Sequence, residues 1–250
     1  MIKIKKDKNK DFVILNLTDL NLDRRDWNNQ DMIDFVYKTI DELIKRTNPD
    51  LITFSGDFSA AEFPECYEKS RKLFEHFNLP WTFVMGNHDN QGGEEVASKL
   101  CDILTQDKNC LFEKGDPKLG VGNFIIQICE DDKPIYALVL MDSHDRKEAT
   151  KENGEKYLAW SNLSKDQLEW LEQNVLAMKL KTTLITHIPI WKYKEVIENA
   201  YKKDIDKKTL TYEESLGSDC WNPGYESSIG VVIQLIVGNL NILREANMLN

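Results

Sequence analysis

The stretch Phe83–Asn90, FVMGNHDN, places three polar residues, Asn87, His88 and Asp89, directly behind an apolar run. The run Pro80–Met85 is typical of a buried strand. A turn would explain Gly86 and Asn87, because glycine and asparagine are common turn residues. A turn does not explain the adjacent imidazole of His88. The junction therefore indicates a functional site at the end of a strand.

Other apolar runs end in the same way. Asp19 follows the run FVILNLT, Asp57 follows LITFSG, and His187 follows the short run Thr182–Thr186. Each residue alone has an ordinary alternative: Asp19 could cap the next segment, Asp57 could belong to a turn, and His187 could be a core histidine. The repetition at successive strand ends favours a shared site.

Amphipathic stretches separate the first three predicted strands, which are Phe12–Leu17, Leu51–Phe54 and Pro80–Met85. The helices expected from the spacing of apolar residues are Asp31–Lys45, Tyr67–Phe77 and Glu94–Leu104. Strands that alternate with helices predict a parallel sheet with right-handed crossovers. In such a sheet, ligands bind beyond the carboxyl ends of the strands, which is where the polar residues lie.

The rhythm of the chain then changes. Phe124–Cys129 and Tyr136–Met141 flank a charged turn and predict an antiparallel hairpin, so we expect a second sheet. Ser164–Met178 has the spacing of a helix, with Ser164 as its N-cap. We expect one α/β domain.

Composition limits the possible partners. The chain has 250 residues and a formal net charge of −10, which disfavours a polynucleotide partner because such binding needs many Lys and Arg contacts to phosphate. No apolar run is long enough for a membrane helix. The five cysteines show no C-x-x-C spacing, and the N-terminus lacks an apolar signal core, so we expect reduced thiols and a cytoplasmic protein. Residues 1–10 predict a basic, solvated and frayed arm.

Four motifs then match a known family in order. Asp19-x-Asn21, Gly56-Asp57, Gly86-Asn87-His88-Asp89 and Thr186-His187-Ile188-Pro189 resemble the D-x-H, G-D, G-N-H-[D/E] and later histidine motifs of calcineurin-like metallophosphoesterases. The resemblance covers about residues 11–232, and the chain looks like the branch related to purple acid phosphatases and fungal cell-cycle phosphatases. It implies a two-sheet β-sandwich flanked by helices, the four-layer αββα metallophosphatase fold.

The resemblance also implies a set of roles. Asp57 would bridge two divalent cations, Mn²⁺, Fe²⁺ or Zn²⁺, with Asp19 and Asn21 on the first and Asn87 and His187 on the second. Carboxylate, amide and imidazole donors suit these ions. His88 would protonate the leaving group, with Asp89 as its orienting partner. The implied reaction is hydrolysis of a phosphate ester on a small molecule or a phosphoprotein.

The sequence departs from the family pattern at two places. Asn21 stands where the first motif normally has a histidine, and no histidine follows His187, so the G-H-x-H motif has no counterpart. We therefore expect residues 233–250 to be an atypical tail, the C-terminal strands to be incomplete, and catalysis by this truncated chain to be impaired. A sheet edge left open would invite self-association. The alternative is a degenerate, non-catalytic binding or scaffold domain.

Two further segments are candidates for contact with substrate. His144 lies at another predicted strand end, where a loop histidine near the mouth of the site is the ordinary alternative. The loop Trp221–Tyr225 contains a Pro-Gly turn and is the best candidate for the rim of the site.

Overall fold

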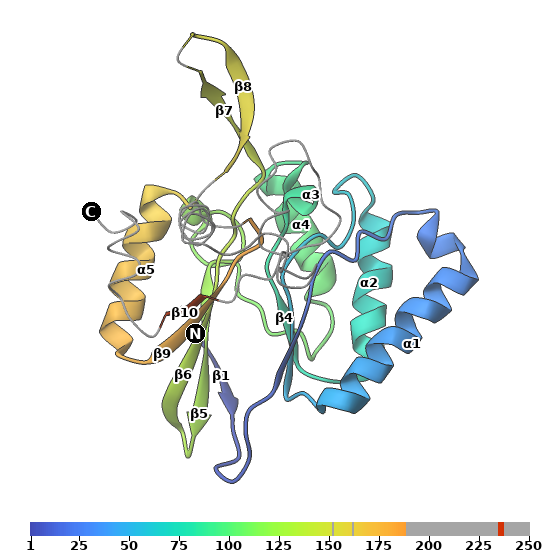
Figure 1. Cartoon of the computed structure of the whole chain (residues 1–250), viewed down its shortest axis with the longest axis vertical. Coiled ribbons are helices and arrows are strands. Elements are labelled where there is room, and N and C mark those ends of the chain that lie inside the picture. Colours follow the sequence, from blue (N-terminus) through green and yellow to red (C-terminus); the bar gives the residue numbers. More distant parts are fainter. Residues whose placement is uncertain (152, 162, 189–234, 238–250) are drawn as a thin grey trace, which may run out of the picture.

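Two β-sheets face each other and helices cover their outer surfaces, as Figure 1 shows for the computed structural model. The structure describes residues 1–151, 153–161, 163–188 and 235–237. Trp221–Tyr225 lies outside the described residues, as does most of the predicted tail.

The first sheet is parallel and has the strand order β2-β3-β4. Its elements are β2 (Ile14–Leu17), η1 (Asp26–Asn28), α1 (Gln30–Thr47), β3 (Leu51–Phe54), α2 (Pro64–Phe77), β4 (Trp81–Phe83), α3 (Asn87–Asn90) and α4 (Glu94–Leu104). Helices thus alternate with parallel strands, as the sequence predicts. The first turn of α1 is capped by the side chain of Asn29, which accepts from the backbone N–H of Met32.

The second sheet is mixed and has the order β1-β5-β6-β9-β10 among the described residues. Its elements are β1 (Ile2–Lys5), η2 (Pro117–Leu119), β5 (Phe124–Glu130), β6 (Lys133–Leu140), α5 (Lys165–Met178), β9 (Lys181–Ile185) and β10 (Leu235–Val237). β5 and β6 form the predicted antiparallel hairpin. Ser164 caps α5 as expected, accepting from the backbone N–H of Gln167.

Apolar side chains fill three layers between these elements. One face of the first sheet packs against α2 and α4 around Phe54, Phe74 and Trp81. Successive side chains along the strands of the second sheet point to opposite faces. Ile126 and Leu138 face the first sheet, while Ile125 and Val139 face α5. The order helices, sheet, sheet, helix confirms the predicted four-layer sandwich.

The N-terminal arm is not frayed, contrary to the sequence-based expectation. Ile2–Lys5 pairs in parallel with β5 as strand β1, and Ile2 and Ile4 pack against the core between the sheets. The basic residues that follow meet the acidic β5–β6 turn, where Lys6 forms a 2.6 Å ion pair with Glu130. The many lysines of the arm suggested a solvated end, although Ile2 and Ile4 have the spacing of a strand. The acidic turn that pairs with these lysines lies far away in the sequence.

The predicted C-terminal tail also contributes to the sheet. β10 pairs antiparallel with β9, so the edge of β9 is covered over three residues. The expected incompleteness of the C-terminal strands does not hold at this edge.

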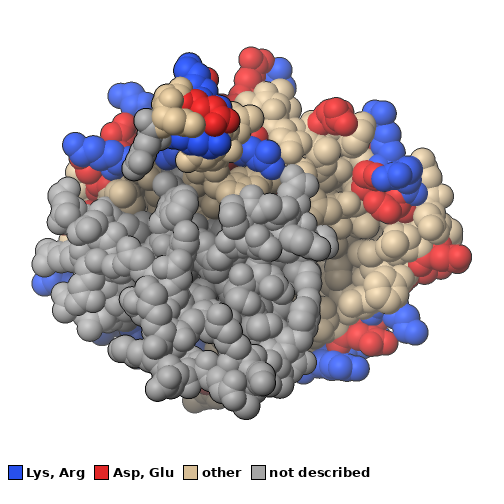
Figure 2. All heavy atoms as spheres, turned by 45° about the horizontal axis from the view of Figure 1, so that its top comes forward, with Lys and Arg blue, Asp and Glu red and all other residues tan. Residues whose placement is uncertain are grey.

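A second hairpin stands away from the sandwich. β7 (Arg146–Thr150) and β8 (Lys156–Trp160) pair antiparallel and project from the body at the top of Figure 1. Over the described part of the face in Figure 2, Lys and Arg side chains lie among Asp and Glu side chains. Among the described residues, no helix combines the length and apolar character that crossing a bilayer requires. The cysteines of the described part, Cys66, Cys101, Cys110 and Cys129, are free thiols.

Candidate metal centre

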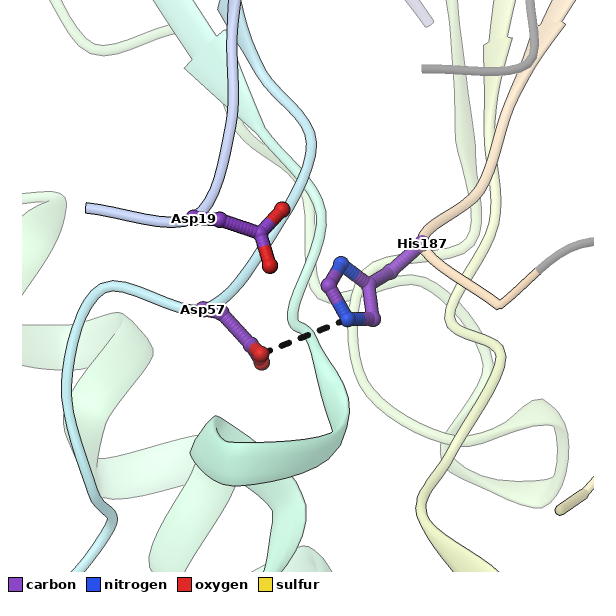
Figure 3. A group of neighbouring side chains, drawn as sticks. All are labelled: Asp19, Asp57 and His187. Carbon is purple, nitrogen blue, oxygen red and sulfur yellow. Dashed lines mark ion pairs between the residues drawn. The ribbon is translucent and has the colours of Figure 1, made fainter. Parts of the chain in front are cut away.

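Three side chains from three strand ends meet at one place between the sheets. Asp19 follows β2, Asp57 follows β3 and His187 follows β9 of the opposite sheet. One ligand atom from each lies within 4.8 Å of the other two. Figure 3 shows His187 approaching Asp19 and Asp57 from the other side of the site. The predicted convergence of these three residues is therefore what the structure contains.

Backbone hydrogen bonds hold the first two loops together. The N–H of Asp19 donates to the carbonyl of Gly56 at 3.0 Å, and the N–H of Asn21 donates to the carbonyl of Asp57 at 3.0 Å. Asp19 and Asp57 both have left-handed backbones, with φ of 54° and 63°. Aspartate tolerates this region better than most residues, yet such conformations are uncommon and concentrate at functional sites.

Two glycines allow the loops to approach so closely. A Cβ on Gly86 would lie 2.1 Å from Oδ1 of Asp57, and one on Gly56 would lie 2.7 Å from both the backbone of Gly86 and Nδ1 of His187. Gly56 also has φ of 101°, which side chains rarely adopt. The G-D and G-N-H-D motifs thus require glycine for steric reasons.

His187 is fixed by both of its ring nitrogens. Nδ1 lies 2.8 Å from the carbonyl oxygen of Ser55, to which it can only donate. This bond directs Nε2 toward the site, where it lies 3.0 Å from Oδ1 of Asn87 and 3.4 Å from Oδ2 of Asp57. A hydrogen bond from the other ring nitrogen is the usual way in which a metal-binding histidine is oriented. Asn87 belongs to the same group, as predicted, whereas sequence reasoning missed Ser55.

Opposite charges shift the protonation of this group. Burial lowers the pKa of His187, but its contact with Asp57 raises the pKa more strongly, to about 9. Burial raises the pKa of Asp57, yet the His187 imidazolium outweighs burial and the pKa lies below its ordinary value. Burial also raises the pKa of Asp19. Without a metal, a proton shared near Nε2 of His187 supplies the positive charge that the two carboxylates need.

His88 lies at the open side of this group. Its backbone N–H donates to Oδ1 of Asp57 at 3.0 Å, and Nε2 of its ring lies 4.0 Å from Oδ2 of Asp57. The side chain is 33% exposed, whereas that of His187 is 9% exposed. His88 is therefore the imidazole of this group that an incoming molecule can reach.

Asp89 does not orient His88, so the expected partnership is wrong. Its buried carboxylate accepts from the backbone N–H groups of Gly86, Asp57 and Phe58, at 2.7, 2.8 and 3.0 Å, and from the hydroxyl of Tyr67. The ring of His88 instead meets Gln91, with 3.1 Å between Nδ1 and Nε2. Burial and the charge of Asp57 raise the pKa of Asp89 to about 6. Asp89 holds the Asp57 loop to the Gly86 loop, because a buried carboxylate without these donors would be very unfavourable.

Two other predicted positions differ from the central group. The backbone of Asn21 joins the site through its bond to Asp57, and its side chain is exposed to solvent. His144 lies between Asp142 and Gln167, with Nδ1 at 3.5 Å from Oδ2 of Asp142 and Nε2 at 3.3 Å from Oε1 of Gln167. Both ring nitrogens of His144 thus have polar neighbours, which favours the structural interpretation of this residue.

The donors at the centre fit a divalent cation. Two carboxylates, the Nε2 atom of one imidazole and the amide oxygen of Asn87 are oxygen and nitrogen ligands of the kind that Mn²⁺, Fe²⁺ and Zn²⁺ accept. The backbone N–H groups of Asp19, Asn21 and His88 are already hydrogen-bonded to carbonyl or carboxylate oxygens of the protein. The side-chain oxygen and nitrogen atoms are therefore the groups that face a ligand.

Strand ends that bring carboxylate and imidazole side chains together are typical of α/β proteins that bind metal ions. The sequence pattern of the calcineurin-like phosphoesterases matches residues 6–216, and the chain belongs to this family. Phosphatase DCR2 of Saccharomyces cerevisiae is 25% identical over 201 residues, which cover 73% of this chain and 34% of that protein. The protein named probable inactive purple acid phosphatase 28 of Arabidopsis thaliana is 24% identical over 182 residues, 62% of this chain and 45% of that one.

This chain therefore spans less than half of the length of either relative. Among solved structures, a dimetal phosphatase from Danio rerio has a TM-score of 0.42 and 10% sequence identity, with 76% of this chain and 77% of that chain covered.

Proposed function

We propose that this chain is a metal-dependent phosphoesterase that hydrolyses a phosphate ester on a small molecule or a phosphoprotein. The observation that carries the proposal is the meeting of Asp19, Asp57 and His187 within 4.8 Å, beside a partly exposed His88. Family membership supports the same class of reaction. A cytoplasmic location, expected from the unpaired cysteines, is part of this proposal.

The ligands divide between the two sheets. Asp19 and Asp57 present carboxylate oxygens from the first sheet, and Nε2 of His187 faces them from the second, with Asn87 beside it. Two divalent cations held by these residues would supply positive charge for the phosphoryl oxygens and lower the pKa of an attacking water. Burial of the ligands strengthens this effect because the charges are poorly screened.

His88 acts on the leaving group. Its ring is the accessible imidazole beside Asp57, with Nε2 at 4.0 Å from Oδ2 of that carboxylate. A protonated His88 can donate to the oxygen that leaves when the ester bond breaks. General acid catalysis of this kind typically contributes about 10²–10⁴ in rate.

The decisive experiment combines metal content with turnover. Purified protein is loaded with Mn²⁺, and bound metal is counted by elemental mass spectrometry while hydrolysis of aryl phosphates is followed. We expect close to two ions per chain, hydrolysis in the wild type, and loss of both properties in Asp57→Ala. An unchanged rate in Asp57→Ala would end the proposal.

The role of His88 has its own signature. p-Nitrophenolate leaves readily without protonation, whereas the oxygen of phenyl phosphate needs a proton. The variant His88→Ala should therefore lose far more rate on phenyl phosphate than on p-nitrophenyl phosphate. His76→Ala, which changes an exposed histidine on α2, is the matched control and should leave both rates unchanged. Equal losses on both substrates in His88→Ala would assign His88 to binding instead.

A non-catalytic binding domain is the second candidate, and the exposed side chain of Asn21 favours it. Asn21 is an amide where the family motif has an imidazole, and the two G-H-x-H histidines are not among the four histidines of this sequence. Fewer donors would hold metal more weakly. Well under one ion per chain, together with no hydrolysis, would favour this candidate.

A further inference from the structure

The candidate metal centre is divided between two separate sheets. His187 is the predicted ligand that follows a strand of the second sheet, whereas Asp19, Asp57 and Asn87 all follow strands of the first. The ligand geometry therefore depends on how the loops of one sheet are held against those of the other. Contacts between these loops can control the site without touching a bound ion.

One buried side-chain pair makes such a contact. Asn90, the last residue of α3, donates from Nδ2 to Oδ1 of Asp142 at 2.9 Å. The same amide donates to the carbonyl of Gly86 at 3.0 Å, so it also closes the turn that carries Asn87 and His88. Asp142 follows β6, which pairs with β9, the strand that leads to His187. The pair thus joins the Gly86–Asn90 turn to the loops of the second sheet.

Asp142 is itself firmly fixed. Its side chain has no solvent exposure, and its carboxylate accepts from the N–H groups of Val121, at 3.0 Å, and His144, at 2.8 Å. Its carbonyl accepts from Nε2 of Gln167 on α5 at 2.6 Å. The next residue, Ser143, accepts from the N–H of Ile188 at 2.9 Å, which ties the same loop to the residue after His187.

We propose that Asn90 and Asp142 are positioning residues that hold Asn87 and His187 in the geometry needed to share a cation. This inference rests on the proposed function of the site. The physical reason is that a buried, charge-assisted hydrogen bond fixes distance and direction between the two loops, and its loss leaves a buried carboxylate short of a donor. Neither side chain is a catalytic residue.

The test uses Asp142→Ala together with the milder Asn90→Ala. Asp107→Ala is the matched control, because Asp107 is 2% exposed and accepts from the indole N–H of Trp81 at 2.7 Å and the N–H of Asn109 at 3.0 Å, away from the site. All three variants should lose thermal stability. We expect Mn²⁺ affinity, measured by calorimetry, to fall about 10–100-fold in the first two variants, the usual effect of losing a group that orients a ligand, and to stay unchanged in Asp107→Ala.

A second measurement needs no metal. The chain contains four histidines, so the imidazole nitrogens of the metal-free protein can be assigned by NMR. The signals of His187 should move in Asp142→Ala and Asn90→Ala and stay in place in Asp107→Ala. If they respond alike in all three variants, or move in none, the positioning role is overturned. If the wild type binds no Mn²⁺, the proposed function fails, while the imidazole signals still decide whether the two loops are coupled.

Discussion

Nε2 of His187 lies 3.4 Å from Oδ2 of Asp57, and the two residues follow strands of different sheets. The pair is buried, and the contact raises the pKa of His187 to about 9 while it lowers the pKa of Asp57. A proton on Nε2 and a cation beside Asp57 therefore compete for the same position.

Mn²⁺ affinity should rise as the pH increases from about 6.5 to about 9, because fewer molecules then carry the competing proton. Calorimetry in buffers of different ionisation enthalpy should show release of a proton on binding at pH 7. His187→Gln keeps a hydrogen-bonding side chain but cannot hold the proton. An equally steep pH dependence in that variant would contradict the assignment.

Stability of the metal-free protein should change in the opposite direction. The folded-state pKa of His187 lies above its unfolded value of about 6.5, so this group stabilises the fold fully below that pH. The stabilisation is lost as the pH rises toward about 9. Urea denaturation of wild type and His187→Gln across this range measures the difference, which should shrink with increasing pH.

Gly86→Ala should disrupt the site for steric reasons. The new Cβ would lie 2.1 Å from Oδ1 of Asp57, so the two loops must separate, at about 1–3 kcal/mol of stability. Mn²⁺ affinity should fall with it. Gly93→Ala is the control, because φ there is 80° but no atom lies within 4 Å of the added Cβ. That variant should carry only backbone strain and bind metal normally.

Tyr67→Phe should be more destabilising than Tyr136→Phe. The hydroxyl of Tyr67 donates to the buried carboxylate of Asp89, whereas that of Tyr136 lies 2.8 Å from the hydroxyl of Thr183. Hydrogen bonds to charged groups contribute about 1.5–3 kcal/mol and neutral ones about 0.5–1.5 kcal/mol. Urea denaturation gives both values. Equal losses would mean that Asp89 is held by its backbone donors alone.

Thiol reactivity tests the packing of the protein core. Cys66, Cys101 and Cys129 are buried, and burial raises the thiol pKa of Cys66 and Cys101. In a Cys220→Ser background, at most one thiol per chain should react rapidly with a disulfide reagent at pH 8. Four should react after unfolding in urea. Rapid reaction of three or more in the native protein would contradict the packed core.

The sequence alone predicted the strands of the first sheet and the polar residues at their ends. Apolar runs such as Leu51–Phe54 are buried on both faces, so their sequence alone identifies them as strands. The polar residues that follow these runs lie where the parallel strands end. His187 also joins the group as predicted, because it ends a strand of the same kind. These features depend on the local order of apolar and polar residues, which a single sequence is enough to show.

The errors concern contacts between distant segments. Asp89 lies next to His88 in sequence, but its carboxylate turns inward to the backbone of Asp57 and Phe58 and to Tyr67 of α2. Asp142 and Asn90 likewise meet only because the sheets pack together. No periodicity records which buried acceptor meets which donor. The strand Ile2–Lys5 was missed because alternate lysines hid its two isoleucines.

The division of the ligands between sheets has a consequence for biosynthesis. A nascent chain leaving the ribosome has Asp19, Asp57 and Asn87 long before His187 is translated, and a domain generally folds as a unit. Under the proposed function, cation binding by all four residues must therefore await late synthesis and the formation of contacts between segments far apart in sequence. Cations that bind the assembled group would then stabilise the folded chain relative to the unfolded chain by mass action.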